Sequence, residues 1–142
     1  MHTQTQAALD MTEIFGEPIH SYTCAQAIED GVLVDVTKTA SEAGFSIPVA
    51  LTSSAWADCV AWDEGDSKRQ THQDEAGRLW DVLWMAITAA RRSAGKQAVE
   101  FQLYRVSRGG RGMRPRLTRL VANIGGGDNG EPVITIMMPG ED

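Results

Sequence analysis

The spacing of apolar residues changes once along the chain, near Gly95. Before that point the clearest pattern repeats at intervals of three and four, at Leu79, Trp80, Leu83, Trp84, Ile87 and Ala90. This spacing predicts an amphipathic helix from about Thr71 to Gly95. Its apolar face, with Trp80 and Trp84 included, is expected to lie against a core.

After Gly95 the apolar residues alternate with polar ones, which is typical of strands. Three runs follow this period of two, at residues 99–104, 119–124 and 133–138. Their short connections favour an antiparallel meander. Asn129 and Gly130 in the second connection, GGGDNG, are a hairpin signal. A phosphate-binding loop is disfavoured there, because a strand follows the glycines and no lysine lies near.

Shorter elements with cap signals fill the N-terminal half. Thr23 and Gln26 fit a capping box, and Gly31 suits the end of that helix. The pattern then predicts a strand at residues 32–36, a short helix from Thr39 to Gly44, and a third helix from Pro48 to about Trp62.

These elements predict an α+β fold in which N-terminal helices pack on a C-terminal antiparallel sheet of three or four strands. A chain of 142 residues suits one domain, so we expect a flexible arm at residues 1–13 and a single domain at residues 14–142. The composition, 42% hydrophobic and 23% charged, is globular. A signal-peptide pattern and a membrane-spanning apolar run are both missing from the sequence, so we expect a cytoplasmic protein.

Charge is unevenly distributed along the chain, whose formal net charge is -6. Residues 1–90 carry 14 acidic and 4 basic side chains, whereas residues 91–119 carry 9 basic and 1 acidic. This asymmetry predicts an acidic and a basic surface, each able to attract an oppositely charged partner. The alternative is that the two regions neutralise each other within the molecule.

The basic region centres on SRGGRGMRPR, residues 107–116. We expect it to form a connection between two strands, with arginines projecting from its tip and from the strand that follows. These candidate partner-binding residues are Arg108, Arg111, Arg114, Arg116 and Arg119. Guanidinium groups bind carboxylates and phosphates through bidentate contacts. Three interpretations stay open: a solvated loop, a contact with an acidic protein and a contact with nucleic acid.

A second candidate surface begins where the third predicted helix gives way to a polar loop. Trp62 at this boundary could expose its indole as an interface anchor. The carboxylates that follow it, Asp63, Glu64 and Asp66, could imitate the phosphates of DNA. The wider acidic set comprises Asp58, Asp63, Glu64, Asp66, Asp74, Glu75 and Asp81.

Catalytic and metal-binding patterns are weak. His20 and Cys24 lie close together in sequence, but neighbouring side chains of an extended segment point apart, so they do not predict a nucleophile with its base. Cys24 and Cys59 lack the spacing of a zinc site, and both thiols are expected to be reduced. We expect no catalytic residue, no metal and no cofactor, and therefore a protein that is not an enzyme.

Three stretches of the chain resemble one family. EPIHSYTCAQAIEDGVLVDVTKTASEAGFSIPVALT (residues 17–52), GRLWDVLWMA (77–86) and NGEPVITIMMPGED (129–142) are similar, in the same order, to recurring blocks of an uncharacterised family of small proteins carried by bacteria, phages and plasmids. Its members usually have arginine where this chain has Cys24, which weakens the case for a cysteine function. The arginine stretch at residues 107–116 lies outside all three blocks.

The resemblance implies no reaction, cofactor or catalytic residue. It implies the setting of a mobile-element accessory protein, in which small acidic proteins frequently inhibit host defence machinery such as CRISPR effectors and restriction enzymes. We therefore expect a non-enzymatic protein that binds a macromolecular partner, with an anti-CRISPR or anti-restriction inhibitor as the leading hypothesis. Nucleic-acid binding by the arginine-rich hairpin is the alternative. No membrane contact is expected, and the chain is expected to be a monomer or a homodimer paired through a strand edge.

Overall fold

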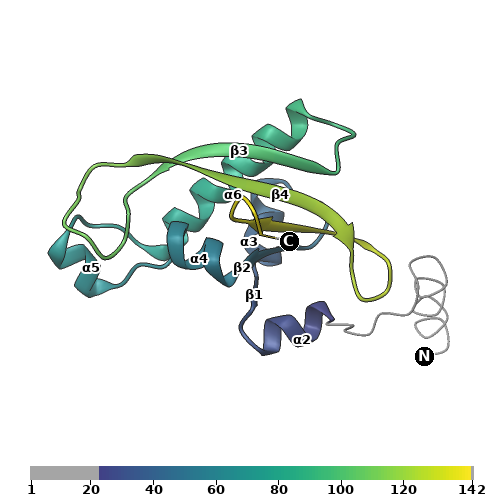
Figure 1. Ribbon diagram of the computed structural model, residues 1–142, viewed down its shortest axis with the longest axis horizontal. Helices are drawn as coiled ribbons and strands as arrows, with labels where there is room; N and C mark the ends of the chain where they lie inside the picture. The colour runs from purple at the N-terminus through teal and green to yellow at the C-terminus, as the bar shows by residue number, and fades with distance from the viewer. Residues whose placement is uncertain (1–22, 142) are drawn as a thin grey trace.

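The computed structural model describes residues 23–141, in which helices pack on a five-stranded mixed sheet (Figure 1). The strands are ordered β1 (Leu33–Asp35), β2 (Val49–Thr52), β5 (Pro132–Met137), β4 (Arg116–Gly126) and β3 (Ala98–Arg105). β2 and β5 run parallel, and every other neighbouring pair is antiparallel. The α+β prediction is confirmed, and β3, β4 and β5 form the predicted antiparallel meander. The whole sheet is mixed and has five strands, rather than antiparallel with three or four, because β2 joins β1 to β5 and runs parallel to β5. The predicted arm at residues 1–13 and His20 lie outside the described residues.

The helices are α2 (Cys24–Glu29), α3 (Thr37–Ala43), α4 (Ser53–Cys59), α5 (Glu64–Arg69) and α6 (Glu75–Arg92). The core lies between α3, α4 and α6 on one side and one face of the sheet on the other. Leu83 of α6 and Leu120 of β4 are fully buried there. In β3, Phe101 and Leu103 face this core while the intervening side chains are exposed, which is the period of two that the sequence shows.

Several predicted helix ends are confirmed. The Thr23 hydroxyl accepts a hydrogen bond from the Gln26 N–H at 3.0 Å, and so caps α2. Gly44, with φ of +115°, ends α3 in the left-handed conformation that favours glycine. α6 begins later than predicted, because its N-cap is Asp74 rather than Thr71, and Asp74 Oδ1 accepts from the Gly77 N–H at 2.6 Å.

The prediction of a helix beginning at Pro48 is wrong for its first turn. Val49, Ala50 and Leu51 form β2, and each is buried. They pair with β1 on one side and with β5 on the other, where Val49 lies opposite Ile134. Successive side chains of a strand point to opposite faces, so three consecutive buried residues show that β2 is covered on both faces, where an apolar run without alternation is typical. The helix starts only after Thr52, whose hydroxyl accepts from the Ala55 N–H at 3.2 Å.

The hairpin between β4 and β5 is confirmed. Gly130 adopts a φ of +80°, and its N–H donates to the Gly127 carbonyl at 3.1 Å. Within residues 23–141, no helix combines the length and the apolar character needed to cross a membrane. The same part of the chain contains no group of three or more His, Cys, Asp and Glu side chains arranged to hold a metal ion.

Candidate binding surface

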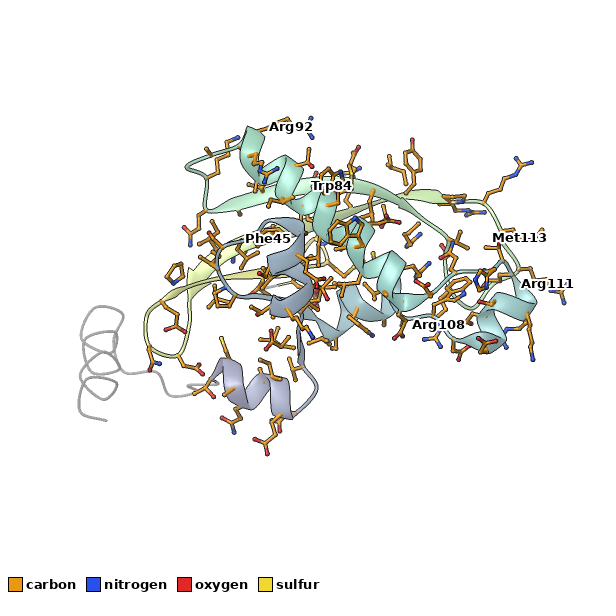
Figure 2. All side chains as sticks on the ribbon, turned by 180° about the vertical axis from the view of Figure 1, so that it is seen from behind. Phe45, Trp84, Arg92, Arg108, Arg111 and Met113 are labelled. Carbon is orange, nitrogen blue, oxygen red and sulfur yellow. The ribbon has the colours of Figure 1, made fainter. Side chains whose placement is uncertain are left out.

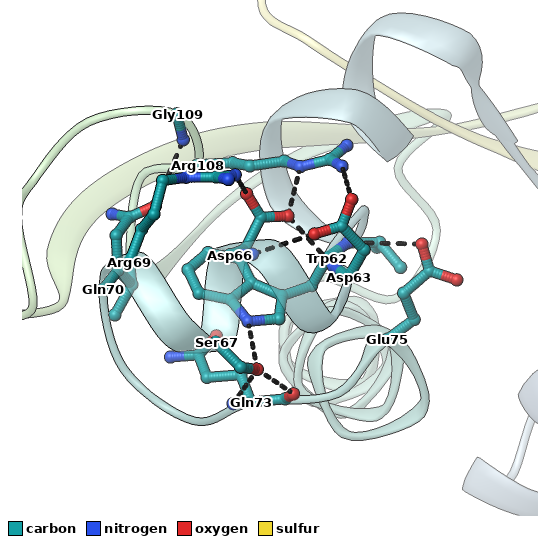
Figure 3. A network of polar contacts seen from close by, with 12 residues as sticks. Trp62, Asp63, Asp66, Ser67, Arg69, Gln70, Gln73, Glu75, Arg108 and Gly109 are labelled. Carbon is teal, nitrogen blue, oxygen red and sulfur yellow. Dashed lines mark hydrogen bonds and ion pairs between the residues drawn. The ribbon is translucent and has the colours of Figure 1, made fainter.

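The loop between β3 and β4, residues 106–115, is joined to α5 by a network of charged side chains (Figure 3). At the start of α5, Asp63 and Asp66 cap each other: the Asp66 N–H donates to Asp63 Oδ1 at 2.8 Å and the Asp63 N–H to Asp66 Oδ2 at 2.9 Å. Arg108 from the loop then bridges both carboxylates, with Nε 2.7 Å from Asp66 and Nη2 3.1 Å from Asp63. Arg69 holds the second Asp66 oxygen at 2.7 Å.

Asp66 is the centre of this network, and its side chain is only 1% exposed. Burial alone raises the pKa of a carboxyl group. Here the hydrogen bonds from the Asp63 N–H and from the Arg108 and Arg69 guanidinium groups outweigh burial and lower the pKa of Asp66 to about 2. The same hydrogen bond to Asp66 raises the pKa of Arg108. Asp66 is therefore an ionised structural anchor for the loop.

Gln70, which is 5% exposed, holds the same loop through its side-chain amide. Its Nε2 donates to the carbonyls of Ser107 at 2.8 Å and Gly112 at 2.6 Å, and its Oε1 accepts from the Gly109 N–H at 3.2 Å. One buried amide thus contacts both arms of a glycine-rich loop. The conformation of the loop depends on α5 as well as on its own turn residues.

Trp62 does not lie where an exposed interface anchor would be. The side chain is 4% exposed, and its Nε1 donates to Ser67 Oγ at 3.1 Å. The guanidinium carbon of Arg78 stands 4.6 Å from its ring centroid, a cation–π contact. The expectation of an exposed indole is wrong because Trp62 continues the run of buried residues that begins at Cys59. Inside the molecule, Ser67 accepts the hydrogen bond of the indole N–H and Arg78 packs over the ring.

Arg78 is a buried cation that the sequence analysis missed. It donates from Nε to the Val60 carbonyl at 3.0 Å and from Nη1 to the Val106 carbonyl at 3.0 Å, tying the end of α4 to the end of β3. Burial lowers its pKa. The sequence does contain an indication of this burial. Arg78 lies on the same helical stripe as Val82 and Ala86, which are buried, and a charged residue at such a position needs partners inside the protein.

The remaining loop arginines are oriented differently. Arg111, Arg114 and Arg116 are exposed, and their side chains make no hydrogen bond or ion pair with the described part of the chain. Arg119 on β4 lies 3.8 Å from Glu100, a loose surface pair. Figure 2 shows Arg111 and Met113 at one end of the molecule. The structure therefore separates the five arginines into an anchor, Arg108, a loosely paired residue, Arg119, and three exposed cations whose side chains have no partner in the described part of the chain, Arg111, Arg114 and Arg116.

The acidic set is largely engaged inside the molecule. Arg105 binds the Asp58 carboxylate in a bidentate manner, with Nη2 3.0 Å from Oδ1 and Nε 3.2 Å from Oδ2. Asp63 and Asp66 bind Arg108, and Glu75 accepts from the Trp62 N–H at 3.2 Å. Glu64 is exposed in the first turn of α5. Part of the charge asymmetry is therefore internal complementarity, in which Arg105 and Arg108 neutralise carboxylates of the N-terminal half.

Trp80 and Trp84 are not core residues, contrary to the prediction. They are 39% and 49% exposed, and their rings stack with centroids 6.3 Å apart. Trp80 and Tyr104 line a hollow of about 510 Å³ that also contains Cys59. Burial, with Asp58 beside it, raises the pKa of the Cys59 thiol to about 12, so the thiolate that a nucleophile needs is absent at neutral pH.

Comparison with known proteins gives a family and no function. No curated protein and no solved structure matches the chain. The model of a protein family of unknown function, DUF6573, matches residues 11–142. The chain therefore belongs to the DUF6573 family.

Proposed function

We propose that this protein is a non-enzymatic binding protein that docks on an acidic protein surface through Arg111 and Arg114, with Arg116 beside them. The supporting observation is that these three guanidinium groups are exposed and unpaired within residues 23–141, on a loop whose main chain is held by Gln70 and Arg108. A loop fixed before binding loses less conformational entropy when a partner binds.

Met113 favours a protein partner over a nucleic acid. It is 63% exposed and lies between Arg111 and Arg114 in the loop. Methionine and arginine are both enriched in the buried centres of protein interfaces. Phosphate contacts, in contrast, need cations and no apolar side chain among them. The surface therefore suits carboxylates arranged around an apolar depression.

The second mechanism, in which carboxylates imitate DNA, has less support. Asp58 and Asp66 are held by arginines of the same chain. Asp63 is 59% exposed but shares Arg108. Freeing these groups would break the network that anchors the loop. The arginine loop is the mechanism that the geometry favours.

The resemblance to mobile-element proteins suggests a class of partner. In the proposal, the acidic surface belongs to a host defence complex, either a CRISPR effector or a restriction enzyme, and binding inhibits it. This target rests on the setting of the family, whereas the arginine contact rests on the geometry.

The test compares two variants that change the net charge equally. R111E/R114E reverses the free loop cations, and K38E/K96E reverses two exposed lysines elsewhere. Each variant, and the wild type, is used to capture partners from a bacterial lysate, and the affinity for each captured protein is then measured with purified components. We expect R111E/R114E to lose at least about tenfold in affinity, from two charge-assisted contacts of about 1 kcal/mol each, while K38E/K96E stays close to wild type.

Two results would reject the proposal. Equal losses in both variants would show that net charge alone governs binding. Binding to a short DNA duplex at low salt, falling steeply as salt is raised, would assign the loop to nucleic acid, because each neutralised phosphate releases counterions.

A further inference from the structure

The two edges of the sheet differ in how well they are protected. β1 has three residues, and Asp35 lies on it, whereas β3 has eight. Native proteins usually shorten, charge or cover an edge strand, because its unpaired N–H and C=O groups can pair with another chain. β3 carries only one acidic side chain, Glu100, and is long for an unprotected edge.

Hydrogen bonding identifies which groups of β3 are free. The Ile124 N–H donates to the Gln97 carbonyl at 2.8 Å, so Gln97 and Ile124 form a hydrogen-bonded pair. In an antiparallel ladder such pairs alternate, which leaves the main-chain groups of Glu100, Gln102 and Tyr104 pointing away from β4. Those groups have no partner in the described part of the chain.

Exposed apolar side chains lie beside this free edge. Trp84 of α6, Tyr104 and Leu117 are 49%, 68% and 50% exposed and line one hollow of about 600 Å³. Asp81 and Arg92 of α6 line the same hollow. Figure 2 shows Trp84 and Arg92 on α6. Aromatic side chains flanked by charges are the usual composition of a protein interface.

We propose that β3 pairs antiparallel with β3 of a second copy, about a two-fold axis near Gln102. Gln102 would then lie opposite Gln102 of the partner subunit, and Glu100 opposite Tyr104 of the partner subunit. Three such pairs supply about six main-chain hydrogen bonds. The two sheets become continuous, and the two copies of α6 lie antiparallel on the same face, with their tryptophans near the axis.

The charge pattern of α6 favours a second copy over an unrelated strand. Asp74, Glu75 and Asp81 lie toward its N-terminus, and Arg91 and Arg92 form its C-terminal end. Two antiparallel copies place each acidic half beside a basic half. Asp81 and Arg92 are the first and last α6 residues that line the hollow beside β3. A two-fold axis through the middle of that hollow, at the level of Ala86 and Ile87, would place Asp81 opposite Arg92 of the partner subunit, and the symmetric contact repeats it. Within one helix the two residues are separated by about 16 Å, too far to pair.

The test measures self-association of the full chain by sedimentation equilibrium from about 1 to about 100 micromolar. D81R and R92D each place like charges opposite each other at two symmetric points, so we expect each to raise the dimer dissociation constant about tenfold. The double variant D81R/R92D restores opposite charges and should recover dimerisation. Because the two residues are far apart in one chain, recovery cannot come from repair of the monomer.

A main-chain variant tests the strand pairing itself. Gln102→Pro removes an N–H that points away from β4, so the β3–β4 ladder stays intact while the edge is blocked. We expect this variant to be folded by circular dichroism and monomeric. A wild-type chain that is monomeric throughout the concentration range would overturn the proposal. A dimer that is insensitive to Gln102→Pro and to both single charge reversals would overturn it equally.

Discussion

Replacing Gln70 tests whether one buried amide fixes the β3–β4 loop. Gln70→Ala removes three hydrogen bonds, to the Ser107 and Gly112 carbonyls and from the Gly109 N–H. Each is worth about 1 kcal/mol net, which gives an upper value of about 3 kcal/mol. The three loop residues are exposed, so water replaces part of what is lost. We expect a decrease of about 2 kcal/mol in the free energy of unfolding.

Urea unfolding followed by circular dichroism measures this decrease as a shift in midpoint at constant slope. Amide hydrogen exchange adds a local measurement, since the Gly109 N–H should exchange faster in the variant. The matched control is Gln97→Ala, at an exposed position, which should change stability by less than about 0.5 kcal/mol. If Gln70→Ala is as mild as this control and leaves Gly109 exchange unchanged, the amide does not hold the loop.

Three further predictions concern buried polar groups. The folded-state pKa of Asp66, about 2, lies below its ordinary value, so the contribution of Asp66 to stability is present above pH 4 and is lost as the pH falls toward 2. Melting temperatures measured across this pH range should therefore fall more for the wild type than for Asp66→Asn. Cys59 is 1% exposed with its pKa raised to about 12, so a thiol reagent should modify Cys24 in the native chain and Cys59 only after unfolding, as mass spectrometry would show. Arg78→Met should lower the free energy of unfolding by about 3 kcal/mol in a urea titration, because buried carbonyl groups lose their donor.

Features set by neighbouring residues could be predicted from the sequence. The Thr23 cap, the Gly44 stop and the hairpin at Gly130 each depend on a few consecutive positions, and the alternation along β3 follows from one buried face. β2 could not be recognised in this way. A run of three apolar residues has no period, and its parallel pairing with β5 joins residues that are distant in sequence.

In α6 the helix was predicted correctly, but the burial of Trp80 and Trp84 was not. Leu79 and Leu83 lie on the buried stripe of α6, while Trp80 and Trp84 each follow by one position. One position turns a helix by about 100°, which moves a side chain from the centre of the face to its margin. The buried position of Trp62 differs from the prediction for another reason. Its burial depends on Arg78 and Ser67, which no local pattern associates with it.

The roles of the arginines were the hardest feature to predict from the sequence, because an arginine that anchors a loop and an arginine that is free to bind a partner look alike there. Arg108 is separated by more than forty positions from Asp66, yet the two form a buried contact that fixes the loop. Gly109, with φ of +90°, and its neighbouring glycines would otherwise leave the chain many conformations to lose on binding. In the proposed docking, Gln70 and Asp66 would therefore act on a partner indirectly, by holding Arg111 and Arg114 in place. It follows that Gln70→Ala should weaken partner binding although every exposed arginine remains, and should leave pairing through β3 unchanged.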